Sequence, residues 1–447
     1  MNRKQFREAA FAKALQAGCT GAELVVTGGE EFGAGVQAGK LDTYTVSRTQ
    51  AFGLRVQYKG KNGYASTEAP EDPGALVAAA MDNAAAVETE DAHPMAEPAA
   101  YPAITPPPDA LAGMGNREKI RLCRELEAMT LAQDPRVKRV ASCKVITVKG
   151  YGAIYNTLGL NAQREDALSC ILVNAILEDG AEVHDGGAFR ARGEALDLAG
   201  CAREAVAEAA AQFGGKPVAP GKYRVLLRND AAYSLLSAFS GMFSADAAQK
   251  GLSLLAGREG EQVAAPQVNL VDDPFYRDNP MAFDDEGSPT QFKAVIQGGR
   301  LQTLLHNLKT ARKAGVSTTG NGGRGGAGSP VGVQPSNLYI PKGELEPAAL
   351  YQALGDGLLI TELSGLHAGV NSISGEFSLL CKGQLLKGGT AGQAGGLHHP
   401  GGQLFRPAPG GGRDRDGSEV FPALRGLLRQ PQPADRRLDG GGPGLRP

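Results

Sequence analysis

The alternation of apolar and polar positions divides the first ninety residues into a helix, a group of strands and a second helix. Apolar positions at helical spacing predict a helix over residues 3–17, which Gly18 ends as a stop signal. An alanine-rich helix is expected from residue 73 to about 87. Between them, alternating runs separated by Gly-Gly and other glycine-containing turns predict short strands at 22–26, 43–46, 51–58 and 63–67. This pattern predicts an N-terminal α+β domain over residues 1–88.

A proline-rich stretch over residues 89–109 has little apolar periodicity and is expected to be an extended linker. A middle α+β domain over residues 110–216 should follow it. Its helices are predicted at 116–133 and 194–213, and its strands at 137–149, 151–156 and 163–178, with a turn at 156–159.

The remaining pattern predicts a β-rich C-terminal domain over residues 217–388, with helical stretches only near 231–243 and 347–353. Its most distinctive block is 361–379, in which glycines and small polar residues precede an alternating run that continues to Cys381. The fold class expected for the whole chain is therefore α+β.

Residues 389–447 no longer resemble a folded protein, because glycine, proline and arginine dominate them and Lys387 is the last lysine. Low hydrophobicity alone would make this segment a natural disordered tail. Arginine without lysine is also what a GC-rich coding region yields when it is read out of frame. Read one nucleotide later, codons for residues 398–406 can spell Ile-Thr-Leu-Ala-Gly-Asn-Phe-Phe-Asp, so we expect a frame change near residues 388–390.

Composition excludes binding by bulk charge and gives no sign of a membrane segment. The chain has 447 residues, 42% of them hydrophobic, and a formal net charge of -2, so nucleic acid is an unlikely partner. It contains no apolar run near 18 residues and no signal-peptide core. Its six cysteines are isolated, as expected for reduced thiols. We therefore expect a cytoplasmic protein with no membrane association.

Candidate chemistry is sparse, and each candidate also has an ordinary structural explanation. Asp284, Asp285 and Glu286 could pair carboxylates or hold a hard cation, or could form a solvated turn before the strand at 290–296. The glycine-rich run 320–329 lacks the Lys-Ser/Thr ending of a phosphate loop and favours a flexible loop at a cleft or subunit contact.

The histidines give no metal motif. None of them lies at ligand spacing from another. His93 lies in the proline-rich linker and His184 in a predicted glycine-bounded turn, and the pattern favours His306 and His367 as interior or turn residues.

Several motifs in order resemble the TldD/PmbA peptidase family, also called modulators of DNA gyrase. They cover the chain to Gly388, and the C-terminal ones are Phe283-Asp284-Asp285-Glu286-Gly287-Ser288-Pro289-Thr290, Thr319-Gly320-Asn321-Gly322, Pro335-Ser336-Asn337 and the block 361–379. In this family, TldD-like chains carry H-E-x-x-x-H and bind zinc, whereas PmbA/TldE-like chains lack this motif and pair with them. The corresponding region here, Leu235–Ser244, contains no His, Cys or carboxylate. Without such ligands no zinc-bound water would be activated in this chain.

The resemblance implies a non-catalytic PmbA/TldE-like subunit of a zinc-dependent cytoplasmic peptidase complex acting in proteolysis or peptide maturation. No cofactor is expected in this chain, zinc is expected in a TldD-like partner, and unfolded peptides are the expected substrates. The alternatives are a stand-alone hydrolase that uses non-standard residues such as His367, Glu286 and Asp285, and a DNA gyrase modulator or other regulatory binding protein. The residues expected at a cleft or subunit contact are Asp284, Asp285, Glu286, Gly320, Asn321, His367 and Asn371.

Overall fold

The computed structural model describes residues 1–88, 93–193 and 196–391. The tail predicted over 389–447 lies outside these ranges, apart from residues 389–391. Within them, mixed helices and sheets lead into a sheet-rich C-terminal region, which confirms the predicted α+β class. No helix in the described ranges is long and apolar enough to cross a membrane.

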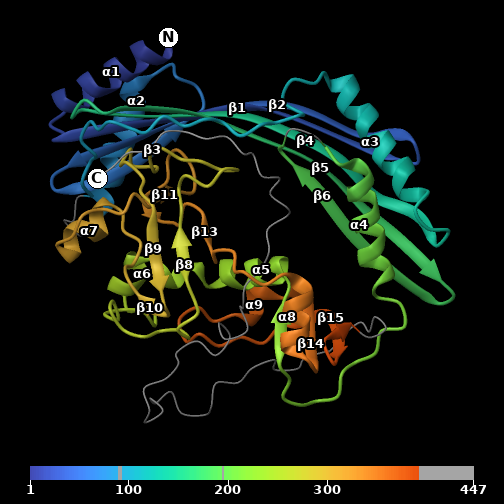
Figure 1. Cartoon of the computed structure of the whole chain (residues 1–447). Coiled ribbons are helices and arrows are strands. Elements are labelled where there is room, and N and C mark those ends of the chain that lie inside the picture. Colours follow the sequence, from blue (N-terminus) through green and yellow to red (C-terminus); the bar gives the residue numbers. More distant parts are fainter. Residues whose placement is uncertain (89–92, 194–195, 392–447) are drawn as a thin grey trace, which may run out of the picture.

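One antiparallel sheet of six strands runs through the N-terminal and middle regions in the order β3-β2-β1-β4-β5-β6. β1 pairs with β4 as well as with β2, so the two regions predicted on either side of residues 89–109 share one sheet. The strands are β1 (Gly21–Gln37), β2 (Lys40–Tyr58), β3 (Lys61–Thr67), β4 (Val137–Asn156), β5 (Asn161–Asp179) and β6 (Glu182–Ala191). Figure 1 shows these long strands arching over the rest of the molecule.

Two of the predicted turns lie inside strands. β1 runs straight through Gly28 and Gly29, where a Cβ atom on Gly28 would lie 2.5 Å from Tyr151 Oη. The region of His184 belongs to β6, where a Cβ on Gly186 would lie 2.3 Å from the Ala205 carbonyl oxygen. In both places glycine permits close packing within or against the sheet rather than a reversal of the chain.

Four helices cover one face of this sheet in two pairs, and each pair builds its own core. α1 (Arg3–Gln16) and α2 (Pro73–Ala86) pack on one end, and α3 (Asn116–Leu131) and α4 (Leu198–Ala210) pack on the other. Leu24 of β1 belongs to the first core and Ala34 to the second. These two residues are an even number of positions apart, so both cores lie on the same face.

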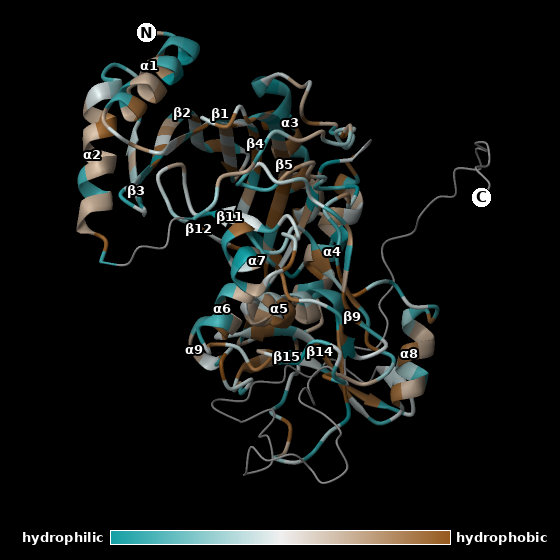
Figure 2. Ribbon diagram, turned by 90° about the vertical axis from the view of Figure 1, so that its left-hand side faces the viewer, coloured by the Kyte–Doolittle hydropathy of each residue, from teal (hydrophilic) through white to brown (hydrophobic). Residues whose placement is uncertain are grey.

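The opposite face of the sheet carries the C-terminal region at the end beneath α1 and α2. Val25 and Ile154 of the sheet form one apolar cluster with Phe283 and Ala327 of the C-terminal region. A Cβ on Gly53 would lie 1.8 Å from the Ala327 carbonyl oxygen, so glycine is required for this approach. Figures 1 and 2 show the C-terminal region below the sheet from two directions.

The C-terminal region contains three small sheets, with strand orders β10-β9-β8-β13, β11-β12 and β16-β15-β14-β7. Its strands are β7 (Val225–Leu227), β8 (Leu270–Asp272), β9 (Lys293–Gln297), β10 (Arg300–Leu301), β11 (Gly322–Arg324), β12 (Val331–Val333), β13 (Leu338–Tyr339), β14 (Gly357–Ser364), β15 (Leu380–Lys387) and β16 (Thr390–Ala391). Its helices are α5 (Asn229–Phe239), a 3-10 turn (Ser240–Phe243), α6 (Ala245–Gln249), α7 (Leu308–Ala314), α8 (Pro347–Leu354) and α9 (Leu366–Gly369). The strand expected at 377–381 begins later, at Leu380, because Phe377 bridges back to Val370 across a tight loop.

Candidate functional site

Asp272, the last residue of β8, joins separate segments of the C-terminal region through a buried hydrogen-bond network. Its Oδ1 atom accepts hydrogen bonds from the backbone N–H groups of Ser336 (2.7 Å) and Asn337 (2.9 Å). Its Oδ2 atom accepts one from Asn321 Nδ2 (2.8 Å) and lies 2.9 Å from Lys293 Nζ. Because Asp272 is fully buried, Lys293 rather than water balances its charge.

The acidic segment Asp284–Glu286 forms a turn, as the second of its two sequence interpretations predicted. The turn is buried rather than solvated. Asp284 and Glu286 are both buried. Asp284 Oδ1 accepts hydrogen bonds from the backbone N–H groups of Glu286 and Ser288, both at 2.9 Å. Its Oδ2 atom accepts one from the Gly322 N–H at 2.7 Å. The Asp284 carboxylate therefore stabilises the turn through hydrogen bonds within it and links the turn to β11.

Asp285 points toward the six-stranded sheet and connects it with the C-terminal region. Its Oδ1 atom accepts a hydrogen bond from Arg164 Nη2 of β5 at 3.0 Å. Its Oδ2 atom accepts one from the backbone N–H of Arg324 at 2.9 Å. Both carboxylate oxygens of Asp285 therefore take part in the contact between the six-stranded sheet and the C-terminal region.

Glu286 contacts a histidine whose importance the sequence pattern did not reveal. Its Oε2 atom accepts a hydrogen bond from the Leu308 N–H (2.8 Å), and its Oε1 atom contacts His93 Nε2. Residues 93–108 have almost no regular secondary structure, as expected for a linker, but His93, Met95 and Ala96 are buried. No spacing rule connects residue 93 with residue 286, and the group of buried positions over 93–96 is too short to predict a contact.

Glu23, on β1, completes this arrangement from the sheet side. Its Oε2 atom accepts a hydrogen bond from Arg55 Nη2 at 2.7 Å, and its Oε1 atom accepts one from Arg324 Nη2. Glu23 and Arg55 are 0% and 1% exposed, so the two arginines rather than water balance the charge of Glu23. We call Glu23, Arg55, His93, Glu286 and Arg324 the interdomain junction.

Burial decides the protonation of the acidic and imidazole groups in and beside this junction. Burial, and after it the charge of Arg55, lowers the pKa of His93 to about 3. Burial raises the pKa of Glu286 to about 7. Burial and then the charge of Glu286 raise the pKa of Asp284 to about 8, although three backbone N–H groups oppose the shift. The contact of His93 with Glu286 is therefore a hydrogen bond of a neutral imidazole rather than an ion pair.

Gly320 and Asn321, which the sequence assigned to a flexible loop, are also part of this buried polar region. Gly320 has φ +68°, and a Cβ there would lie 2.5 Å from the Pro289 carbonyl oxygen. Asn321 is 1% exposed and bonds to Asp272. The glycines that follow form the β11–β12 hairpin and the turn that packs on Gly53, not a phosphate loop before a helix. The network around Asp284–Glu286 and Asn321 therefore joins regions, and the carboxylates of Asp284 and Glu286 are buried within it.

His367 and Asn371, the other two predicted site residues, lie elsewhere. Both are exposed, on α9 and in the loop after it. Asn371 Oδ1 accepts hydrogen bonds from the Ile373 N–H (3.0 Å) and the Ser374 N–H (3.1 Å), which makes it a turn-forming residue. Figure 1 shows α9 far from α7, whose first N–H group binds Glu286. The structure thus brings five of the seven predicted residues together and leaves these two apart.

The segment Leu235–Ser244, which the resemblance aligns with a zinc motif, comprises the end of α5 and the 3-10 turn after it. Leu235, Met242 and Phe243 are buried in apolar cores. In the parts of the chain that the structure describes, no three His, Cys, Asp or Glu side chains are grouped so that they could hold a metal ion. The residues present in this segment do not fit zinc, since Leu, Met and Phe offer it no suitable ligand.

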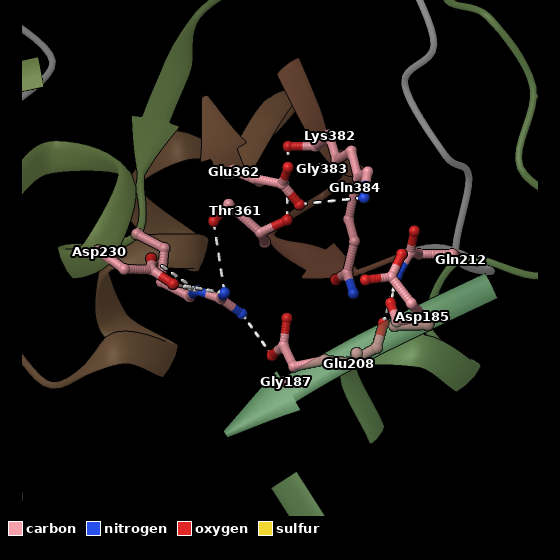
Figure 3. Close-up of a pocket in the computed structure, with 13 residues that line it drawn as sticks. Asp185, Gly187, Glu208, Gln212, Asp230, Thr361, Glu362, Lys382, Gly383 and Gln384 are labelled. Atoms are coloured by element: carbon pink, nitrogen blue, oxygen red, sulfur yellow. Dashed lines mark hydrogen bonds and ion pairs between the residues drawn. The ribbon is translucent and has the colours of Figure 1, made fainter. Parts of the chain in front are cut away.

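A cavity of about 240 Å³ lies where the middle region meets the C-terminal region. It is lined by β6, the end of α4, the start of α5, β14 and β15 (Figure 3). Arg228 crosses it and donates hydrogen bonds to Glu208 Oε1 (2.5 Å), Asp230 Oδ2 (2.6 Å) and the Thr361 carbonyl oxygen (3.3 Å). The lining comes from five separate segments, and of these only residues 361–362, in the block 361–379, stood out in the sequence.

Comparisons with known proteins agree over most of the chain. Sequence models of the PmbA/TldA metallopeptidase family match it in three parts: domain 1 at residues 22–84, the central domain at 109–213 and the C-terminal domain at 220–394. The protein MJ0231 of Methanocaldococcus jannaschii is 27% identical over 352 residues, which cover 76% of this chain and 78% of that protein. The metalloprotease PmbA of Escherichia coli O157:H7 is 23% identical over 375 residues, with 80% and 79% covered.

Two solved structures share the fold. A Thermotoga maritima protein named as a modulator of a DNA gyrase is 33% identical, with a TM-score of 0.80 and with 88% of this chain and 90% of that chain covered. TldE from Thermococcus kodakarensis is 20% identical, with a TM-score of 0.79 and with 88% and 89% covered. At that identity the second likeness concerns the fold alone.

Proposed function

Because the chain belongs to the PmbA/TldD metallopeptidase family, we propose that it is the metal-free, PmbA/TldE-like subunit of a cytoplasmic zinc-dependent peptidase assembly. In this proposal the chain forms part of a shared chamber and helps to bind the peptide there. A TldD-like partner supplies the zinc and carries out the hydrolysis. The assembly would act on unfolded peptides, in proteolysis or peptide maturation.

The observation that carries this proposal is the chemistry of Leu235–Ser244. A catalytic zinc site needs three protein ligands and an open position for water. This segment offers apolar side chains, Gly241 and three serine hydroxyls, and its Leu235, Met242 and Phe243 are buried. Neutral hydroxyls are poor substitutes for imidazole or thiolate, so a zinc-bound hydroxide has no support here.

The rival of a stand-alone hydrolase receives less support from the geometry. It would need His367, Glu286 and Asp285 to act together, yet His367 is exposed on α9. Glu286 is fully buried against His93 and Leu308, and Asp285 is engaged by Arg164. A substrate would have to open the interdomain junction to reach Glu286, and it would have to displace Arg164 to bind Asp285.

The test compares the purified chain, a TldD-like chain and a mixture of the two. The measurements are cleavage of a fluorogenic unfolded peptide, zinc content by mass spectrometry and the mass of the complex. We expect the chain alone to bind no stoichiometric zinc and cleave nothing, and the mixture to form a complex whose activity requires zinc in the partner. Zinc-dependent cleavage by this chain alone would contradict the proposal, as would an activity of the partner that this chain does not change.

A gyrase-modulating or DNA-binding role is suggested by the names of relatives, such as that of the Thermotoga maritima protein. The formal net charge of -2 does not favour it. DNA binding that weakens steeply as salt is raised would revive this alternative.

A further inference from the structure

Strand β6 is an edge strand, and its outward backbone groups pair with no other strand in the described residues. Among the described strands, β6 pairs with β5 only, and the two join through a two-residue turn closed by the pair Asp179 and Glu182. In such a hairpin the closing pair bonds to each other, so even-numbered residues of β6 point their N–H and C=O groups toward β5. The odd-numbered residues 183, 185, 187 and 189 therefore point theirs away from the sheet.

The side-chain contacts of β6 agree with this assignment. The Asp185 carbonyl oxygen accepts a hydrogen bond from Gln212 Nε2 at 2.6 Å, and the Phe189 carbonyl oxygen accepts one from Arg190 Nη1 at 2.8 Å. For Gly187, none of the hydrogen bonds among the described residues reaches its N–H or C=O from outside the sheet. Unpaired groups of this kind on an edge strand are a template for a further strand.

The cavity of about 240 Å³ lies directly beside this edge. Asp185, Gly186 and Gly187 line one side, and Gly383 and Gln384 of β15 line another (Figure 3). Because β15 closes the far side, a second large sheet cannot approach β6 here, whereas a single extended chain can. This volume is below the range typical of pockets for drug-sized ligands, about 300 to 1,000 Å³, and suits a short piece of such a chain.

The charges of the cavity favour a basic side chain in that segment. Arg228 is paired with Glu208 and Asp230, and Lys382 lies 3.1 Å from Glu362. Asp185 has a hydrogen bond from Asn174 Nδ2 at 3.3 Å, but no ion pair with any cation in the described ranges. Its carboxylate is thus the one lining acid that an incoming cation can neutralise without breaking an existing pair.

We propose that an extended peptide segment adds to the outer edge of β6, with a basic residue opposite Asp185 and an apolar residue opposite Phe189. Asp185 and Phe189 are four positions apart, so their side chains lie on the same face of the strand. Phe189 is 65% exposed, which gives the apolar residue a surface to cover. The segment's backbone replaces the Gln212 side chain at the Asp185 carbonyl oxygen. Only the source of the peptide rests on the proposed function, because all the residues of the site belong to this chain.

The test measures peptide binding to the full chain without any partner, by fluorescence anisotropy. The probe is a labelled, unstructured decapeptide of Thr, Ser and Val that carries one Lys and one Tyr four positions apart, with a matched peptide in which Gln replaces Lys. Gly187→Pro removes the outward N–H but leaves the β5–β6 ladder intact, because that N–H does not point to β5. Val183→Pro is the matched control, since it makes the same change on the same strand outside the cavity.

We expect Gly187→Pro to abolish binding of both peptides and Val183→Pro to preserve it. Asp185→Asn should lower affinity for the Lys peptide by about two- to fivefold, the range of a cross-strand ion pair, and should leave the Gln peptide unchanged. Hydrogen exchange over residues 185–189 should slow when peptide binds. Absence of binding to the unmodified chain would overturn the proposal, and so would equal effects of the two proline variants. A Gly187→Pro effect confined to self-association of the chain would overturn it in favour of a second copy. None of these readouts depends on a partner's activity, so failure here is distinct from failure of the proposed function.

Discussion

The substitution Glu23→Gln tests whether the interdomain junction holds the C-terminal region on the sheet. It keeps the shape of the side chain and removes the negative charge. Two guanidinium groups depend on that charge: Arg55, whose Nη2 lies 2.7 Å from Glu23 Oε2, and Arg324, which bonds to Oε1. The Glu23 and Arg55 side chains are 0% and 1% exposed, and that of Arg324 is 4% exposed, so water cannot replace the lost partner.

The expected loss in the free energy of unfolding comes from the arginine charges that stay buried after the substitution. Removing one partner of a buried ion pair costs about 3 to 5 kcal/mol, because the remaining charge stays uncompensated. Glutamine still offers one carbonyl oxygen to an arginine, which places the expected loss near the lower limit, about 3 kcal/mol. With a urea slope of about 3 kcal/mol/M, the unfolding midpoint should fall by about 1 M.

Glu30→Gln is the matched control because Glu30 lies on the same strand and pairs with Arg48 at the surface. The side chains of that pair are 80% and 58% exposed, so its loss should cost at most about 1 kcal/mol, or about 0.3 M in urea. The chain has no tryptophan, so unfolding is followed by circular dichroism and tyrosine fluorescence. A chain of several regions need not unfold in one step, and the midpoint of the first transition is the relevant quantity.

Equal shifts for Glu23→Gln and Glu30→Gln would refute this reasoning. Such a result would mean that the two arginines find other partners or water when the carboxylate charge is removed. A lower first midpoint for Glu23→Gln, with separate transitions for the sheet and the C-terminal region, is the outcome we expect.

Three further predictions concern pH, packing and the end of the chain. Burial raises the pKa of Glu286 from 4.5 to about 7, so the folded state holds more protons in that window and stability should fall as pH rises through it. The urea midpoint at pH 8 should be lower than at pH 5.5, and Glu286→Gln should flatten this difference. Gly53→Ala should lower the free energy of unfolding by about 1 to 3 kcal/mol, measured by thermal unfolding, because the new Cβ would lie 1.8 Å from the Ala327 carbonyl oxygen. Gly33→Ala should leave the stability unchanged, because the nearest atom to its Cβ would be 3.9 Å away. The gene should encode apolar stretches in the shifted frame across residues 392–447, and a nucleotide sequence without them would rule out the frame change.

Much of the fold was readable from local patterns. The first helix, predicted at 3–17, is observed at Arg3–Gln16, and the second, predicted at 73–87, at Pro73–Ala86. Both have strong local signals, namely apolar periodicity and capping residues. Strand lengths were underestimated because Gly28 and Gly186 resemble turn residues in sequence. Their role is close packing against groups that are far away in the chain.

The candidate site was predictable only in part for the same reason. Asp284 and Asn321 belong to motifs with several fixed residues in a short span, so the sequence identified them. His93 stands alone in a proline-rich stretch, and only the fold brings it to Glu286. His367 stands in an equally distinctive motif, yet the structure leaves it exposed in a turn.

The sequence by itself determined the family, the α+β class, the positions of most helices and the lack of zinc ligands in Leu235–Ser244. These are properties of residue types and local order. Only the tertiary structure decided that two predicted domains share one sheet, that Glu23, Arg55, His93, Glu286 and Arg324 meet, and that the edge of β6 faces a cavity. The physical reason is that strand pairing and buried ion pairs join residues far apart in the chain, such as Glu23 and Arg324, which are 301 positions apart. No local sequence pattern specifies such a partner.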